Sequence, residues 1–236
     1  MYQKIAESII KNILDEKYTD KLPTEKELGE KYHVSRHTVR KALDIVFTHG
    51  MIKRVRGSGY YVIKRPLKSK KVLNLSLIFE KNDDYSENAL KSKVIKFDII
   101  HANNELAQRG NIDEGTEIYR LIRLRYFKGQ LYDLEESYFP RSVVPLLTEK
   151  SVYGSVFNFL YDTYKIVGET SEDYIQIGNV SEYYTNLLKK DKNEKVLYLD
   201  AINYLSGGVV FNFSRTFFAD DDLILYYHTK NIGLNN

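Results

Sequence analysis

The chain has 236 residues, of which 43% are hydrophobic and 13% aromatic, a composition typical of globular proteins. It has no cysteine, which excludes disulfide scaffolds, thiol nucleophiles and cysteine-bound zinc. Its five histidines are scattered, and we expect neither a metal site nor a cofactor. It has no signal-type start and no apolar run of about 18 residues, so we expect a cytoplasmic protein that does not bind membranes.

The net charge of +3 is unevenly distributed along the chain. Residues 1–71 carry 17 Lys and Arg against 8 Asp and Glu, whereas residues 72–236 carry 18 against 24. Between Lys53 and Lys71 there are eight basic residues and no acidic one. This asymmetry is typical of a nucleic-acid-binding surface at one end of the chain, although a solvated basic linker has the same composition.

The first 50 residues carry the signals of three helices. Apolar residues recur at helical spacing over residues 2–16, which predicts an amphipathic first helix. Pro23 stops any continuation, and Thr24 with Glu27 makes a capping box that starts a short second helix. After a tight break, Ser35 is a good N-cap for a third helix.

The third helix is expected to end near Gly50, with an apolar stripe on one side and basic residues on the other. The stripe consists of Val39, Ala42, Leu43, Val46 and Phe47. Arg36 and Arg40 fall outside it. The first turn of such a helix reaches base edges in DNA, where arginine bonds bidentately to guanine, and Ser35 and Thr38 offer hydroxyls. The pattern predicts a helix-turn-helix, and the alternative is an ordinary helical hairpin with a solvated basic face.

A predicted β-hairpin follows directly, with strands at residues 52–56 and 60–64 joined by Gly57-Ser58-Gly59. A tip without bulky side chains can enter a narrow groove or approach phosphates with bare backbone. Basic side chains stand beside it: Lys53, Arg54 and Arg56. The hairpin is therefore interpreted as a wing.

Residues 22–62 resemble the winged helix-turn-helix of the GntR family of bacterial transcription regulators. The resemblance rests on Leu22-Pro23-Thr24-Glu25, the run Val34–Leu43, Gly50-Met51-Ile52 and the run Gly57–Val62. With the basic Arg56 beside the tip, it implies that double-stranded operator DNA is contacted by Lys26, Ser35, Arg36, His37, Thr38, Arg40, Arg56, Gly57, Ser58 and Gly59. His37 stands at a variable position of the motif, so we expect it to set operator preference.

The chain is long enough for a second, larger domain, and we expect the division 1–65, linker 66–75 and 76–236. The remaining pattern favours strands paired by hairpins with a few helices between them, which indicates an α+β domain built on an antiparallel sheet. The expected strands are 72–79, 94–100, 117–127, 131–139, 195–205 and 209–218. The expected helices are 103–109, 155–164 and 180–190, with a loop or short helix at 80–92.

Strand alternation puts Arg123 and Arg125 on one face among apolar neighbours. A three-residue hairpin loop would place Arg125 opposite Asp133 and Arg123 opposite Glu135, whereas a two-residue loop would break this alignment. The four residues are either salt bridges on a solvated face or part of a cavity in which arginine binds a phosphate or carboxylate. Ser155, which opens a helix, is either an N-cap alone or a further anion contact.

The region from about Lys93 onward resembles the UTRA effector-binding domain of the HutC subgroup, which shares the chorismate lyase fold. The motifs that carry this resemblance are Arg123-Leu124-Arg125, Glu135 with Tyr138 and Pro140, Ser155-Val156-Phe157 and Asn212-Phe213-Ser214. It implies that the effector is bound by Arg123, Arg125, Glu135, Ser155, Phe157, Asn212 and Phe218. Asn212 stands where the subgroup often has Glu, and Phe157 and Phe218 where Tyr is frequent. We therefore expect the distal part of the effector to be recognised differently.

These features predict a homodimeric, DNA-binding transcription regulator. We expect it to repress a sugar-utilisation operon and to be released or modulated by a small anion such as a phosphorylated sugar. One alternative is an enzyme acting on a small anionic metabolite with a fused DNA-binding domain. No nucleophile–base pair with readable spacing supports that reading, and no catalytic residue is expected. Another alternative is a second domain that only dimerises.

Overall fold

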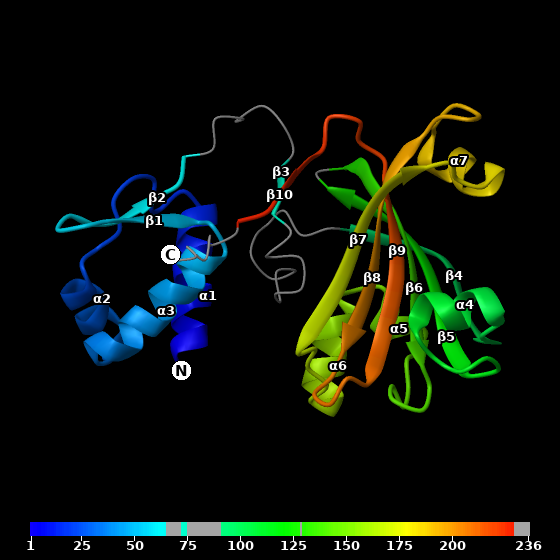
Figure 1. Cartoon of the computed structure of the whole chain (residues 1–236), viewed down its shortest axis with the longest axis horizontal. Helices are drawn as coiled ribbons and strands as arrows, with labels where there is room; N and C mark the ends of the chain where they lie inside the picture. Colours follow the sequence, from blue (N-terminus) through cyan, green and yellow to red (C-terminus); the bar gives the residue numbers. More distant parts are fainter. Residues whose placement is uncertain (65–71, 75–90, 128, 229–236) are drawn as a thin grey trace, which may run out of the picture. The chain divides into compact units, whose positions relative to one another are not determined.

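The structure is a computed structural model that describes residues 1–64, 72–74, 91–127 and 129–228 (Figure 1). The expected linker and the expected loop at 80–92 lie largely outside these residues, as does the second half of the expected strand 72–79. The chain divides into two compact units, one formed by residues 1–86 with 222–236 and the other by residues 87–221. The expected domain boundaries stay a prediction.

Three helices and a hairpin form the first unit, as the local signals predicted. The elements are α1 (Tyr2–Leu14), α2 (Glu25–Tyr32), α3 (Arg36–Thr48), β1 (Ile52–Val55) and β2 (Gly59–Val62). The capping box is confirmed, since Thr24 N donates to Glu27 Oε2 at 2.7 Å and Glu27 N to Thr24 Oγ1 at 3.3 Å. The apolar stripes of α1 and α3 meet in one core with Leu22, Leu28, Met51 and Ile52.

A short segment from the C-terminal part of the chain belongs to this unit. Strand β10 (Ile224–Tyr226) pairs in parallel with β3 (Val72–Asn74). Beyond it, the His228 ring packs edge-on against Phe47 with ring centroids 5.5 Å apart, and Tyr226 Oη donates to the Gly50 carbonyl at 3.3 Å. We call residues Ile224–His228 the C-terminal strap. It lies against the end of α3, and the sequence patterns did not predict it.

The second unit is built on a six-stranded sheet in the order β4-β5-β6-β9-β8-β7 (Figure 1), and every neighbouring pair is antiparallel. The strands are β4 (Lys91–His101), β5 (Glu117–Phe127), β6 (Gln130–Pro140), β7 (Thr170–Gly178), β8 (Val196–Tyr204) and β9 (Val210–Phe218). The α+β class is confirmed. Some details of the prediction are wrong: Lys91 and Ser92 belong to β4 rather than to a loop, and neither β7 nor the short helix α5 (Glu149–Val152) had been predicted.

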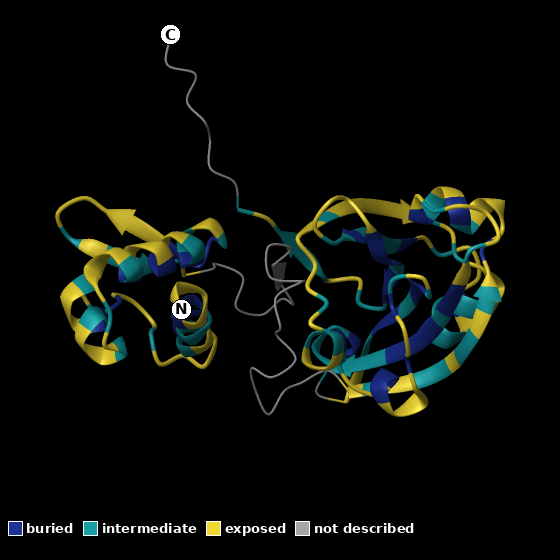
Figure 2. Cartoon of the chain, turned by 90° about the horizontal axis from the view of Figure 1, so that it is seen from below, coloured by how far each residue is buried: buried dark blue, intermediate teal, exposed yellow. Residues whose placement is uncertain are grey.

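Helices cover both faces of this sheet. On one, here called the α6 face, α5 (Glu149–Val152) and α6 (Val156–Tyr164) pack against Tyr119, Leu121 and Phe139. On the other, the α4 face, lie α4 (Asn104–Gly110) and α7 (Glu182–Leu188). Figure 2 shows buried residues along the strands of the sheet, whereas β7, at its edge, is exposed along most of its length. None of the helices in the described part of the chain has the length and apolar character needed to cross a lipid bilayer.

Candidate DNA-binding and effector sites

The exposed side of α3 carries the predicted base-reading residues. Val39, on the opposite side, is fully buried, whereas Arg36 and His37 in the first turn are exposed. Ser35 Oγ accepts a hydrogen bond from Thr38 N at 3.3 Å and lies 3.0 Å from Thr38 Oγ1. Ser35 is therefore the N-cap of this helix, and its hydroxyl already has protein partners.

Glu25 links the second helix, the third helix and the hairpin of the unit. Its carboxylate accepts from Arg40 Nε on α3 at 2.8 Å and from Tyr60 Oη on the wing at 3.3 Å. The guanidinium of Arg40 is thereby oriented, although its side chain stays 64% exposed. Lys26 lies next to Glu25 and is exposed, 3.8 Å from the carboxylate of Glu30. Such an exposed pair contributes little, so Lys26 is free to change partner.

The tip of the wing consists of Arg56, Gly57 and Ser58. Gly57 and Gly59 have φ values of +75° and +114°, conformations that glycine adopts without strain. Arg56 is exposed, whereas the Ser58 hydroxyl lies 2.6 Å from Tyr61 Oη. Arg54, expected beside the tip, forms an ion pair with Asp44 and stacks on Phe47, so it is held by the protein itself.

In the second unit the predicted pairs are confirmed, but the predicted loop is wrong. Arg123 lies opposite Glu135 and Arg125 opposite Asp133. The hairpin closes at Phe127 and Gln130, so only two residues connect the strands, which by itself would break this alignment. A β-bulge restores it, because Leu131 pairs with Tyr126 and the next pair is Arg125 with Asp133, which leaves Tyr132 as the extra residue.

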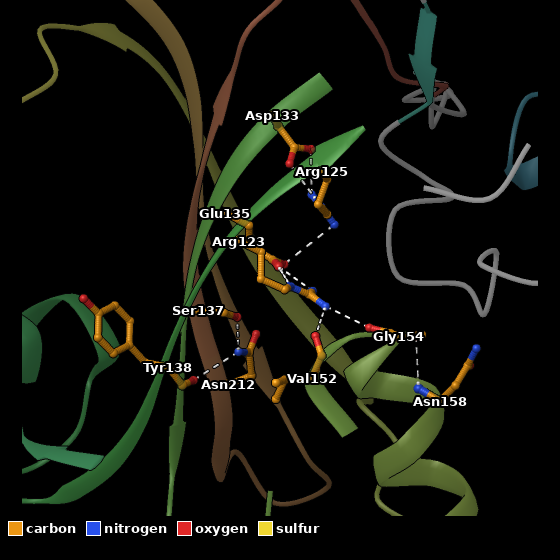
Figure 3. A network of polar contacts seen from close by, with 11 residues as sticks. Arg123, Arg125, Asp133, Glu135, Ser137, Tyr138, Val152, Gly154, Asn158 and Asn212 are labelled. Carbon is orange, nitrogen blue, oxygen red and sulfur yellow. Dashed lines mark hydrogen bonds and ion pairs between the residues drawn. The ribbon is translucent and has the colours of Figure 1, made fainter. Parts of the chain in front are cut away.

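Arg123 is the centre of the resulting polar cluster (Figure 3) and is 6% exposed. Nε and Nη2 both donate to Glu135 Oε2, at 2.9 and 2.5 Å. Nη1 donates to the carbonyls of Val152 and Gly154, at 3.1 and 2.8 Å. Arg123 therefore ties the sheet to the turn that precedes α6.

Arg125 is less completely bonded. Nε and Nη2 donate to the two oxygens of Asp133 at 2.7 and 2.8 Å, whereas Nη1 lies 3.7 Å from Glu135 Oε1, beyond hydrogen-bond distance. Its side chain is 22% exposed, while that of Asp133 is fully buried. The interpretation as salt bridges on a solvated face is therefore wrong.

The two carboxyl groups respond to this surrounding in opposite ways. Burial by itself would raise the pKa of Glu135, but the charges of Arg123 and Arg125 outweigh it and bring the pKa to about 2. Burial raises the pKa of Asp133, against the opposing effect of Arg125. The cluster therefore holds Glu135 as a carboxylate at neutral pH.

The remaining predicted effector residues lie on the α6 face as well, without a hydrogen bond to this cluster among the described residues. Ser155 caps α6, with its Oγ accepting from Asn158 N at 3.3 Å, and follows directly on Gly154, whose carbonyl Arg123 holds. Phe157, in the first turn of α6, packs against Phe211 with ring centroids 5.6 Å apart. Phe218 lies edge-on to the Tyr132 ring that the bulge displaces.

Asn212 is buried and belongs to a separate amide network. Its Nδ2 donates to Ser137 Oγ and to the Tyr138 carbonyl, both at 3.0 Å (Figure 3). Its Oδ1 accepts from Asn203 Nδ2 at 2.8 Å. Sequence reasoning missed Asn203 as well as the Val152 carbonyl. Strand alternation could have placed Asn203 on this face, but a backbone acceptor from a turn leaves no sequence signal. Among the described residues, no group of three or more His, Asp or Glu side chains is arranged to hold a metal ion.

A winged helix-turn-helix and a sheet domain with a buried arginine–carboxylate cluster together define a DNA-binding protein with a separate ligand-binding domain. Family models agree with this class: residues 1–62 match bacterial regulatory proteins of the gntR family, and residues 86–223 match the UTRA domain. The chain belongs to the GntR family of transcription regulators and carries a UTRA domain.

Two relatives that match this chain over more than nine-tenths of both lengths are transcription regulators. The HTH-type transcriptional regulator YydK of Bacillus subtilis is 31% identical over 216 residues, 91% of both chains. The Escherichia coli repressor of the mannosyl-D-glycerate transport/metabolism system, MngR, is 31% identical over 224 residues, 94% of this chain and 92% of that protein. The solved structure of YydK is similar with a TM-score of 0.76 at 28% identity, covering 97% of this chain and 99% of that one.

The family and these relatives are transcription regulators, so the alternative of an enzyme is not supported. Regulators of this family bind operator DNA through the helix-turn-helix and a small-molecule effector through the UTRA domain. The chain is accordingly a DNA-binding transcription regulator.

Proposed function

We propose that this chain is a homodimeric, cytoplasmic repressor of the HutC subgroup that controls a sugar-utilisation operon. Its DNA binding is regulated by an anionic sugar, and a phosphorylated sugar is the first candidate. The observation that carries the proposal is the buried cluster of Arg123, Arg125 and Glu135 on a domain separate from the DNA-binding unit. A related regulator, MngR, is named as the repressor of a system for a sugar derivative that bears a carboxylate.

Within the proposed site, the two arginines have different roles. Arg125 offers its Nη1 edge to the anionic group of the effector, because that edge has no hydrogen bond to Glu135 and the side chain is partly exposed. Arg123 positions Gly154 and hence the N-terminus of α6, where Ser155 adds a hydroxyl. Glu135 accepts sugar hydroxyls with Oε1, since both bonds from Arg123 go to Oε2. Phe157, Asn212 and Phe218 form the distal wall.

The covalent chain provides a route from this site to DNA. Phe218 ends β9, and six residues later Ile224 begins the C-terminal strap, which lies against Gly50 at the end of α3. An effector that moves the end of β9 therefore pulls on a segment that contacts the recognition helix. We propose that this strap and the linker at residues 66–75 couple the two binding sites, so that effector binding changes the affinity for DNA and DNA binding changes the affinity for effector. Residues 1–65 hold the DNA, and two copies are required because one winged helix reads too short a site.

A thermal-shift screen tests the effector. With a panel of sugar phosphates and sugar acids, the true effector at 100 times its dissociation constant is expected to stabilise the protein by about 2.7 kcal/mol. Arg125→Ala should abolish this shift, while Lys165→Ala, which removes an exposed cation after α6, should keep it. If no anionic sugar raises the melting temperature, the effector proposal is wrong. A shift that survives Arg125→Ala would place the effector elsewhere.

The DNA-binding surface is tested with Arg36→Ala. Because Arg36 is exposed in the first turn of α3, its loss is expected to cost about 1 to 3 kcal/mol of binding to the operator and to relax discrimination at one base pair. Fluorescence anisotropy with operator and random duplexes measures both quantities. Lys4→Ala, which removes an exposed cation from α1, is the control and should change neither. An equal loss on random DNA would make Arg36 a phosphate contact.

A further inference from the structure

A cleft lies on the α4 face of the sheet, on the opposite side from Arg123. It has a volume of about 360 Å³ and is formed by α4, β5, β6, β8, β9 and the start of α7. Glu135 and Glu136 are neighbours on β6, so their side chains point to opposite faces, and Glu136 lies in this cleft. The cleft is therefore separate from the proposed effector site, although the two share a strand.

Three arginines line the cleft, and two of them are fixed by ion pairs with aspartates outside it. Arg120 donates Nε and Nη2 to Asp98 at 2.8 and 2.6 Å. Arg215 donates the same two nitrogens to Asp200 at 2.6 and 2.7 Å. Neither aspartate lines the cleft. In both arginines the remaining edge, Nη1, is not used by these bidentate pairs, and the guanidinium plane is fixed in advance.

Arg109 is the third arginine, and its hydrogen-bonding capacity is not satisfied. The guanidinium lies over the Tyr138 ring, 5.0 Å from its centroid, and over Phe213 at 5.8 Å. Its Nη1 is 3.6 Å from Glu136 Oε2, whereas Nε and Nη2 are buried and have no hydrogen-bond partner among the described residues. A buried donor without a partner costs about 1 to 3 kcal/mol, which a bound acceptor would recover.

The Glu136 carboxylate in the cleft already accepts hydrogen bonds from two tyrosines. Glu136 Oε1 accepts hydrogen bonds from Tyr138 Oη at 2.5 Å and from Tyr184 Oη at 2.9 Å. Burial, together with the neighbouring Glu136 carboxylate, raises the pKa of both phenols, so they stay protonated donors at neutral pH. Glu136 and Glu105 thus face three arginines in the cleft. Asp98 and Asp200 offset the charges of two of them, so the free guanidinium edges, rather than a net positive charge, make the cleft suited to an anion.

We infer that the cleft on the α4 face is a second ligand site, which binds a small anion with a carboxylate or phosphate group. Arg109, Arg120 and Arg215 contact the anionic group, and the faces of Tyr198 and Phe217 lie against the rest of the molecule. This inference does not depend on the proposed effector, because none of its residues belongs to the Arg123 cluster.

The site also has a direct connection to the proposed effector site. Tyr138 contributes its side chain to the cleft and its backbone carbonyl to Asn212 on the α6 face. An anion that draws Arg109 away from the Tyr138 ring therefore acts on a strand that both sites use. Occupation of one site should change the affinity of the other, and by an equal factor in both directions.

The test uses the full-length Arg125→Ala protein, in which the effector site is disabled, and isothermal titration with glucose 6-phosphate and with D-glucuronate. Because Asp133 loses its buried partner, circular dichroism first establishes that this protein is folded, and the parent protein is titrated in parallel, where the same site should appear. The two ligands share a pyranose ring and differ in the anionic group, so they distinguish phosphate from carboxylate. Saturable binding of at least one of them is expected, at one molecule per chain. Absence of binding with both would overturn the inference.

Two further substitutions in the same background act in opposite directions. Arg109→Met keeps the apolar stem but removes the charge, and it should weaken binding at least about tenfold. Glu136→Gln keeps an acceptor for the two phenols but removes the opposing charge, and it should tighten binding several-fold, an effect that loss of folding cannot produce. Lys192→Met, an exposed cation 76% accessible, is the control. If Arg109→Met and Glu136→Gln both leave the affinity unchanged, the anion binds elsewhere and the inference is wrong.

Discussion

Glu135→Ala is expected to lower the free energy of unfolding by about 3 to 5 kcal/mol, because it leaves Arg123 buried without its carboxylate partner. Removing one member of a buried ion pair costs more than the pair itself contributes, since the remaining charge keeps its desolvation penalty. Urea denaturation at pH 7 measures the change. Glu114→Ala, an exposed carboxylate in a turn of the same unit, is the control and should stay within about 0.5 kcal/mol.

The pH dependence gives this prediction a second readout. The pKa of Glu135 is lowered to about 2 from an ordinary value of 4.5. A lowered pKa means that the carboxylate stabilises the folded protein above pH 4.5, and that this contribution is lost as the pH falls towards 2. The difference between the parent protein and Glu135→Ala should therefore shrink between pH 4.5 and 2. A difference that is small at pH 7, or constant across this range, would contradict the buried ion pair.

Gly50→Ala is expected to destabilise the first unit by about 2 to 4 kcal/mol and to detach the C-terminal strap. Gly50 has a φ of +63°, which costs an L-residue about 1 to 2 kcal/mol. A Cβ atom there would also lie 2.4 Å from His228 Cβ and 2.5 Å from Tyr226 Oη, so the strap must move away. Chemical denaturation and operator titration with and without effector measure the two consequences.

Gly57→Ala is the matched control for this substitution. Gly57 has a φ of +75°, but no atom lies within 4 Å of the position that a Cβ would occupy. It should therefore destabilise the unit only by the conformational cost of about 1 to 2 kcal/mol. Because Gly57 is a predicted DNA contact, the quantity compared is the change in operator affinity on adding effector, which should stay as in the parent protein. If Gly50→Ala and Gly57→Ala cost the same and both keep the response, the strap contributes neither stability nor coupling.

Local signals accounted for the DNA-binding unit almost completely. The capping box at Thr24, the N-cap at Ser35 and the glycines with positive φ act over three or four residues, so the chain displays them in full. The pairing of Arg123 with Glu135 was also predicted, yet through a loop that the structure does not have. Burial favours the face on which these residues meet, and the bulge at Tyr132 is the adjustment that keeps them there.

Contacts between distant segments left no comparable signal. Strand β7 is mostly exposed and begins with four polar residues, Thr170–Asp173, so the apolar alternation that marks a half-buried strand is limited to Ile175 and Ile177. The strap depends on a pairing between β3 and β10, about 150 residues apart, and three-residue strands carry no periodicity to detect. The cleft on the α4 face gathers Arg109, Glu136 and Arg215 from three elements, and strand alternation indicates the face of a residue but not its neighbours.

The sequence by itself determined that this protein binds DNA, through a helix-turn-helix and wing whose caps, turns and exposed arginines are local features. It also predicted Arg123 and Arg125 as the candidate anion-binding pair. Only the tertiary structure decided that Arg123 and Asp133 are buried while Arg125 stays partly exposed, that a strap returns to the end of α3, and that an arginine-lined cleft lies on the α4 face of the sheet. The physical reason is that capping and turn preferences act between near neighbours in the chain, whereas burial, ion pairing and cavity formation depend on which distant segments pack together.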